Sequence, residues 1–94
     1  MNTFDINVLV YEEGGKFVAH AMELDICDVA DTKEVACKYL MELCCIQIEA
    51  AFRDDNLEYL FRSPTMEIWQ KYISFPENTV VLSVPFDGRI AFKK

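Results

Sequence analysis

The sequence predicts an α+β domain in which an antiparallel β-sheet carries one long helix on one face, in the order β-β-β-α-α-β. Residues 4–11 alternate between two sets of side chains with period two, as in a strand with one buried face. Gly14-Gly15 follows and supplies the positive φ angles of a tight hairpin turn. Residues 33–53 then read as a long amphipathic helix.

The elements between the first turn and the long helix are short. Residues 16–22 are predicted to form the return strand, and residues 26–30 a short third strand. Asp31-Thr32 marks the helix start, because a threonine hydroxyl accepts a hydrogen bond from an amide of the first turn. Glu34 in that turn favours the positive end of the helix dipole.

The long helix has a narrow polar stripe, which consists of Glu34, Lys38, Glu42, Glu49 and Arg53. The remaining arc is apolar and wider than one sheet face needs. Cys45 and Ile46 interrupt the polar stripe, so we expect them to lie in an oligomer interface, most simply that of a homodimer. The alternative is that a second helix carrying Ile68, Trp69 and Tyr72 covers the excess.

The second half of the chain begins with residues 57–61, whose pattern is ambiguous. Ser63-Pro64 then predicts a helix start, with serine as the cap and proline at the first helical position, before a short helix over residues 67–72. Residues 79–86 are rich in β-branched side chains and predict a strand, at whose end or edge Pro85 is tolerated. Asp87-Gly88 indicates a hairpin before a last short strand over residues 89–92.

Length, composition and charge limit the classes of function. A chain of 94 residues predicts one domain, residues 1–94, and its 52% hydrophobic content is more than so small a domain easily hides. The net charge of −7 disfavours direct binding to nucleic acid, which requires Lys and Arg to displace counterions. A basic protein partner is compatible with that charge.

The cysteines and the N-terminus give no sign of metal, cofactor, export or membrane. Cys27, Cys37, Cys44 and Cys45 form no Cys-x-x-Cys pair, and only one histidine is present to join them. We therefore expect free thiols in a reducing cytoplasm and no bound metal. There is no glycine-rich phosphate loop, no signal-peptide pattern and no apolar run long enough for a membrane span.

Two stretches, residues 17–25 and 30–36, resemble the HicB-like antitoxin domain family. Glu23-Leu24, Asp31-Thr32 and Ala36 match the family pattern, whereas proline, glycine and glutamate are usual at the positions of Met22, Ala30 and Val35. The resemblance implies a partial ribonuclease-H-like layer that binds a small basic ribonuclease toxin and covers its catalytic residue. Full-length antitoxins of this type add a DNA-binding part, for which residues 54–94 show no basic recognition helix.

An acidic rim is the candidate partner-binding site. Asp25, Asp28 and Asp31 recur every three residues, with Glu23 nearby. Two-metal nucleases use clustered carboxylates, but these four lie along one loop and strand instead of converging. A solvated rim is therefore favoured, and Glu23, Asp25 and Asp28 are expected to receive the Lys and Arg side chains of a basic partner.

Catalysis is not expected. His20 lies inside a predicted strand, where a general base would need an orienting carboxylate and a substrate pocket. No nucleophile–base pair accompanies it. The first hypothesis is therefore a non-catalytic protein-interaction module. The alternative is a small-molecule-binding or enzymatic α+β domain with its site in a cleft of the sheet.

Overall fold

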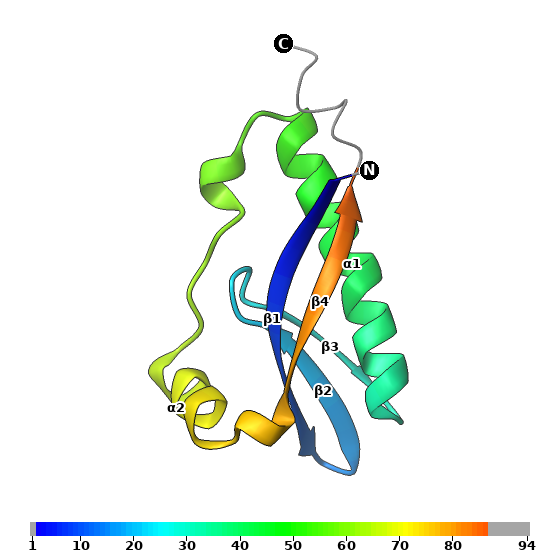
Figure 1. Ribbon diagram of the computed structural model, residues 1–94, viewed down its shortest axis with the longest axis vertical. Helices are drawn as coiled ribbons and strands as arrows, with labels where there is room; N and C mark the ends of the chain where they lie inside the picture. Colours follow the sequence, from blue (N-terminus) through cyan, green and yellow to red (C-terminus); the bar gives the residue numbers. More distant parts are fainter. Residues whose placement is uncertain (1, 87–94) are drawn as a thin grey trace.

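The computed structural model describes residues 2–86 and confirms the α+β class (Figure 1). Its strands form one antiparallel sheet in the order β3-β2-β1-β4. In chain order the elements are β1 (Asn2–Glu13), β2 (Lys16–Ala21), β3 (Ile26–Ala30), α1 (Lys33–Arg53), the 3₁₀ turn η1 (Leu57–Tyr59), α2 (Met66–Ser74), the 3₁₀ turn η2 (Pro76–Asn78) and β4 (Thr79–Phe86). The turn expected at Asp87-Gly88 and the strand expected over residues 89–92 lie outside the described residues.

Strand β1 is the long central strand, and its two halves have different neighbours. Its second half pairs with β2, from Val8 opposite Ala21 to Glu13 opposite Lys16. Its first half pairs with β4. The β1–β2 hairpin turns at Gly14-Gly15, where φ is 61° and 80°, as the sequence predicts. The sheet is therefore staggered, with β2 and β3 beside one end of β1 and β4 beside the other.

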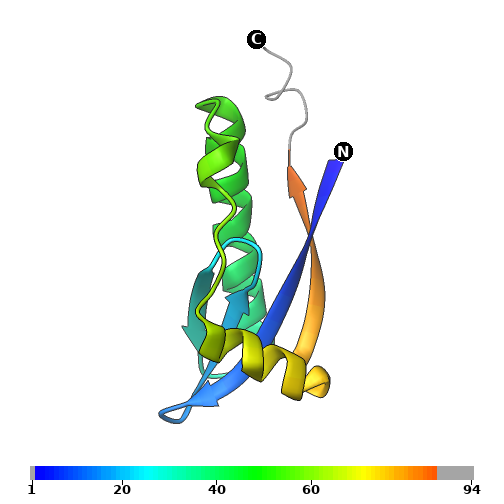
Figure 2. The same ribbon diagram turned by 90° about the vertical axis from the view of Figure 1, so that its left-hand side faces the viewer.

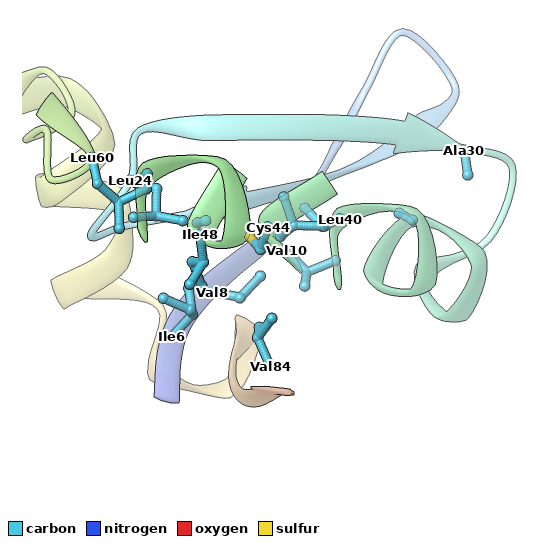
Figure 3. Packing of buried hydrophobic residues seen from close by; sticks show 14 residues of the cluster. Ile6, Val8, Val10, Leu24, Ala30, Leu40, Cys44, Ile48, Leu60 and Val84 are labelled. Carbon is cyan, nitrogen blue, oxygen red and sulfur yellow. The ribbon is translucent and has the colours of Figure 1, made fainter. Parts of the chain in front are cut away.

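Helix α1 covers one face of this sheet and forms the main core with it (Figure 3). Its fully buried stripe is Ala36, Leu40, Cys44, Ile48 and Ala51. These residues pack against Ile6, Val8 and Val10 of β1 and against Val84 of β4. Spacings of three and four residues place the stripe on one side of the helix. The helix begins as predicted, since Thr32 Oγ1 accepts a hydrogen bond of 3.1 Å from the Val35 amide.

Helix α2 lies on the opposite face of the sheet from α1 (Figures 1 and 2). The alternative prediction, that this second helix covers the excess apolar surface of the long helix, is therefore wrong. The helix also begins later than Ser63-Pro64 suggests. Its N-cap is Thr65, and the Ser63 hydroxyl accepts a 2.9 Å hydrogen bond from Trp69 Nε1 instead of capping the helix. On the face opposite α1 the sheet buries Leu9, Val18 and His20, and Met22 in the turn after β2 is buried as well.

The connection from α1 to α2 passes from one face of the sheet to the other beside the first half of β1, which β2 leaves uncovered (Figure 1). Leu60 of this connection packs into the α1-side core. The Arg62 amide donates a 3.0 Å hydrogen bond to the Glu23 carbonyl, and the ring of Phe61 lies 5.6 Å from that of Phe4. The connection thus closes a gap in the sheet.

Candidate interaction surfaces

The turn between β2 and β3 is fixed by two carboxylates of the predicted acidic rim. Glu23 accepts two hydrogen bonds from Asn7, one of 2.9 Å from the backbone amide and one of 2.6 Å from Nδ2. Asp25 has a φ of 51°, and its amide donates to the Ala21 carbonyl at 2.9 Å. An Asp side chain tolerates this left-handed conformation better than most. Two rim residues are therefore engaged within the chain.

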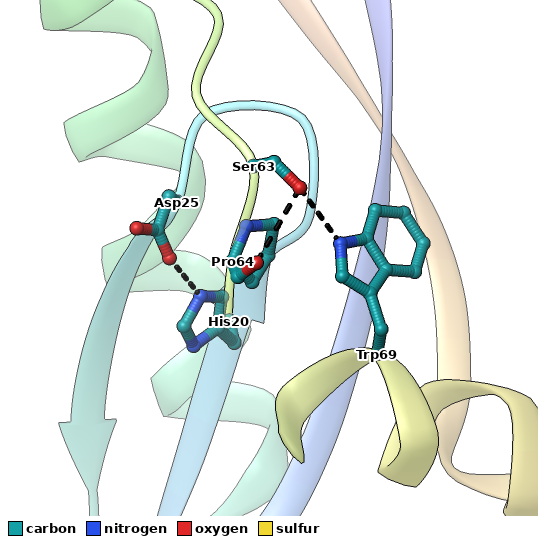
Figure 4. Close-up of polar contacts among 5 residues, drawn as sticks. All are labelled: His20, Asp25, Ser63, Pro64 and Trp69. Atoms are coloured by element: carbon teal, nitrogen blue, oxygen red, sulfur yellow. Dashed lines mark hydrogen bonds and ion pairs between the residues drawn. The ribbon is translucent and has the colours of Figure 1, made fainter. Parts of the chain in front are cut away.

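Asp25 also supplies the carboxylate that sequence reasoning missed for His20. His20 Nε2 lies 2.8 Å from Asp25 Oδ1 (Figure 4). The pair forms because the turn reverses the chain, so that a side chain five residues further on reaches back over the strand. The sequence feature that could have predicted this pair is a histidine in a strand that is followed by a tight turn with an aspartate.

The geometry of the His20–Asp25 pair indicates a structural role and not a catalytic one. His20 is only 8% exposed, in the layer between the sheet and the segment that carries Ser63 and Pro64. Nδ1 is buried and has no hydrogen-bond partner among the described residues. A general base must reach the proton that it removes. Neither ring nitrogen is open to a substrate here, so the arrangement ties β2 to the turn.

The outer strand β3 and the turn before it carry two carboxylates, Asp25 and Asp28, which together we call the acidic edge. Cys27 lies close to these carboxylates, and their negative charge affects the pKa of its thiol. Burial raises the pKa of the Cys27 thiol, and Asp25, Asp28 and Glu13 raise it further. In the described part of the chain no strand pairs with the outer side of β3. The edge thus combines unpaired backbone with carboxylates.

The neighbouring surface extends this negative field toward α2. Burial raises the pKa of the Tyr11 hydroxyl, and Cys27, Glu13 and Glu67 contribute to the same shift. Asp31, the last of the evenly spaced aspartates, pairs instead with Lys16 at 2.5 Å. Within residues 2–86 no group of three or more His, Cys, Asp or Glu side chains is placed to hold a metal ion.

The opposite edge of the sheet, β4, is apolar. Val80 and Leu82 point to the α1 face and Val81 to the other, since they pair with Val8, Ile6 and Asn7 respectively. Val80 is 42% and Val81 61% exposed. A trough of about 370 Å³ runs between this strand and the first half of α1. Its apolar lining is Val10, Cys37, Val80 and Leu82, and its polar lining is Lys33, Glu34, Glu77 and Asn78.

The residues predicted to form an oligomer interface point in different directions. Cys45 is half-buried, and its thiol donates a 3.2 Å hydrogen bond to the Pro85 carbonyl of β4. Ile46 is 62% exposed on the surface of α1. Cys45 therefore joins α1 to β4 within one chain, whereas Ile46 remains available to a partner. Their role in an interface stays a prediction.

The thiols share one electrostatic property. Burial raises the pKa of Cys44 to about 11, with a further contribution from Glu23. Burial also raises the pKa of Cys37 and Cys45, assisted by Glu34 and Glu49 respectively. A thiolate is the reactive form of cysteine, so these shifts lower reactivity at neutral pH.

Comparison with protein-family models, with curated proteins and with solved structures gives no match. No helix within residues 2–86 has both the length and the apolar character that crossing a membrane requires.

Proposed function

We propose that this chain is a non-catalytic protein-binding module whose acidic edge receives an extended segment of a basic partner protein. The observation that carries the proposal is the outer side of β3, which has no strand partner among the described residues and lies beside Asp25 and Asp28. An added strand gains backbone hydrogen bonds from such an edge. Complementary charge selects the partner and speeds the encounter.

The roles within the edge follow from the contacts. Asp28 is half-buried on β3, and its carboxylate accepts a 2.9 Å hydrogen bond from the next amide, Val29. Asp25 extends the negative charge beyond the start of the strand while it holds His20. Glu23 keeps the turn in shape through Asn7. In the proposal, Lys or Arg side chains of the partner bind Asp28 and Asp25. Glu23 holds the turn that positions these two aspartates.

The resemblance to HicB-like antitoxin domains supports the same type of partner. The residues that carry it, Glu23-Leu24 and Asp31-Thr32, flank β3 directly. In that family the partner is a small basic toxin. We propose a partner of this chemistry here, a small basic protein whose activity is blocked when the module covers it.

The binding test uses a synthetic octapeptide of alternating Lys and Val as the probe, with the matching Glu–Val peptide as its control. Isothermal titration at low salt should detect binding of the Lys–Val peptide only. The Asp28→Lys variant should weaken this binding by at least about tenfold. Glu42→Lys makes the same charge change on the exposed side of α1 and should leave it within about twofold.

Equal weakening by Asp28→Lys and Glu42→Lys would contradict the proposal, because it would reduce the interaction to net charge. Absence of binding by the Lys–Val peptide would also contradict it. A cellular test applies if a short basic reading frame is found beside the gene. If its expression arrests growth, the wild-type chain should relieve the arrest and Asp28→Lys should not.

A further inference from the structure

The outer side of β4 is a long strand edge without a described neighbour. The strand is the last in the sheet order and has eight residues. Natural proteins usually blunt such edges with charges, bulges or very short strands. Residues Thr79–Phe86 contain no ionisable side chain, and Val80 and Val81 are exposed on opposite faces. Only Pro85, near the end, interrupts the backbone donors.

The space beside this edge is suited to an added strand. The trough of about 370 Å³ lies on the α1 face, where Val80 and Leu82 form its strand side and Cys37 lies on its helix side. A small apolar ligand would fill the trough but leave the backbone of β4 unpaired. A strand fills the trough with alternate side chains and also satisfies the backbone groups.

Charge decides which strand fits. Two copies of this chain each carry a net charge of −7, so they approach most easily along a strand that has no ionisable side chain of its own. Beside β4 the charges that line the trough are of both signs, Lys33 against Glu34 and Glu77. At the acidic edge a second copy would bring Asp28 and its neighbours against their own equivalents. At β4 no strand residue repels its counterpart, because the strand has no charge.

We infer that β4 pairs antiparallel with β4 of a second copy, so that two sheets join into one across a two-fold axis. A self-complementary strand satisfies the requirement of a closed dimer that one patch serves both copies. A register centred on Val81 pairs Thr79 with Ser83 and Val80 with Leu82 of the second copy. It leaves Pro85 outside the ladder and places the apolar side chains of both copies over both troughs.

This interface is independent of the proposed binding at β3, and each can fail without the other. It also differs from the interface predicted at Cys45 and Ile46, since Cys45 is already hydrogen-bonded to Pro85. Other occupants of the edge are the chain's own residues 89–92, which lie outside the described residues, and a strand of a different protein.

Sedimentation equilibrium of the full chain between about 2 and about 200 µM tests the inference by mass action. The wild type should reach twice the chain mass of 10.9 kDa. Val81→Lys should weaken self-association at least about tenfold. Val29→Lys is the matched control, because Val29 is 47% exposed on the other edge strand, and it should dimerise like the wild type. Circular dichroism confirms that each variant is folded.

A wild type that stays monomeric at the highest concentration overturns the inference. If Phe92→Lys then dimerises, the chain's own C-terminal segment is what covers β4. A dimer that survives Val81→Lys but dissociates in Ile46→Glu also overturns it and places the contact on α1. An unfolded Val81→Lys is replaced by Val80→Lys on the same edge, with the same expected loss of dimer.

Discussion

The two edge strands of the sheet, β3 and β4, are held by different types of contact. Around β3 the chain uses polar contacts: Asp25 holds His20, Glu23 holds Asn7, and Asp31 pairs with Lys16. Around β4 the side toward the core is apolar, with Val84 fully buried, and the polar contacts are single hydrogen bonds from Cys45 to the Pro85 carbonyl and from Ser83 to Asp5. The β3 strand has five residues with carboxylates beside it, whereas β4 has eight residues and no charge.

This difference gives the two proposed interactions different requirements. Carboxylates at the β3 edge repel acidic chains, including other copies of this one, and remain open to basic partners. The uncharged β4 edge has no such selectivity beyond shape and apolar character. One sheet therefore offers two surfaces with different preferences, and substitutions at each should have different consequences.

The largest effect on stability is expected where β4 contributes a side chain to the core. Val84→Ala removes methyl groups from the core beneath β4, where the side chain has no exposure. The lost burial and the cavity should cost about 2–3 kcal/mol in the free energy of unfolding. Val29→Ala, at a half-exposed site on the other edge strand, should cost less than about 0.5 kcal/mol. Urea unfolding measures both, and equal losses would show that the edges are not built differently.

The next effect is expected at the polar support of the acidic edge. Glu23→Ala removes both acceptors of the Asn7 amide groups in a part-buried site. Hydrogen bonds to a charged group contribute roughly 1.5–3 kcal/mol, so the free energy of unfolding should fall by about that amount. Glu12→Ala, an exposed carboxylate on the same sheet, is the control and should be neutral. A neutral Glu23→Ala would mean that the turn does not depend on this carboxylate.

A smaller effect is expected from Lys16→Ala, which breaks the ion pair with Asp31. Both side chains are largely exposed, at 54% and 81%. Water and salt screen such a pair, so the loss should stay below about 1 kcal/mol. Repeating the urea unfolding in about 1 M salt should remove the difference from the wild type. A loss that persists there would indicate packing by the lysine stem.

The smallest effect is chemical and concerns two thiols, Cys27 on β3 and Cys44 in the core formed by α1. Cys27 is exposed and Cys44 is buried with its pKa raised to about 11. Alkylation followed by mass spectrometry should label Cys27 well before Cys44. Because the pKa of each is raised, labelling should be slow at neutral pH and accelerate as the pH rises through and beyond the ordinary thiol range. Fast labelling of Cys44 at neutral pH would contradict the burial of that face.

Much of the fold could be predicted because its signals are local. The bounds of α1 and β4 agree with the sequence prediction, since a threonine cap, a period of 3.6 and a β-branched run each lie within one element. The predicted helix over residues 67–72 lies within α2, but its predicted cap was wrong. Ser63 and Pro64 satisfy a helix-start pattern, whereas the serine hydroxyl accepts a hydrogen bond from Trp69, a contact that depends on packing.

The candidate surfaces were less predictable because they depend on pairing. The sequence indicated the acidic character of the segment that contains β3. It gave no sign that Glu23 binds Asn7 across the sheet or that Asp25 reaches back to His20. The exposed trough beside β4 depends on the line that α1 takes across the sheet, which no local pattern specifies. Strand order decides which edges stay open, and that order is a property of the whole chain.

Binding through both edges of the sheet is tested most directly by amide hydrogen exchange of the full chain, followed by mass spectrometry at about 2 and about 200 µM protein. We expect residues 79–86 to exchange more slowly at the higher concentration and residues 26–30 to stay unchanged. Addition of the Lys–Val peptide should then slow residues 26–30 alone. Protection that appears instead on α1 around Ile46, or a peptide effect spread over the whole acidic surface, would contradict the claim that this chain binds its partners through the two edges of its sheet.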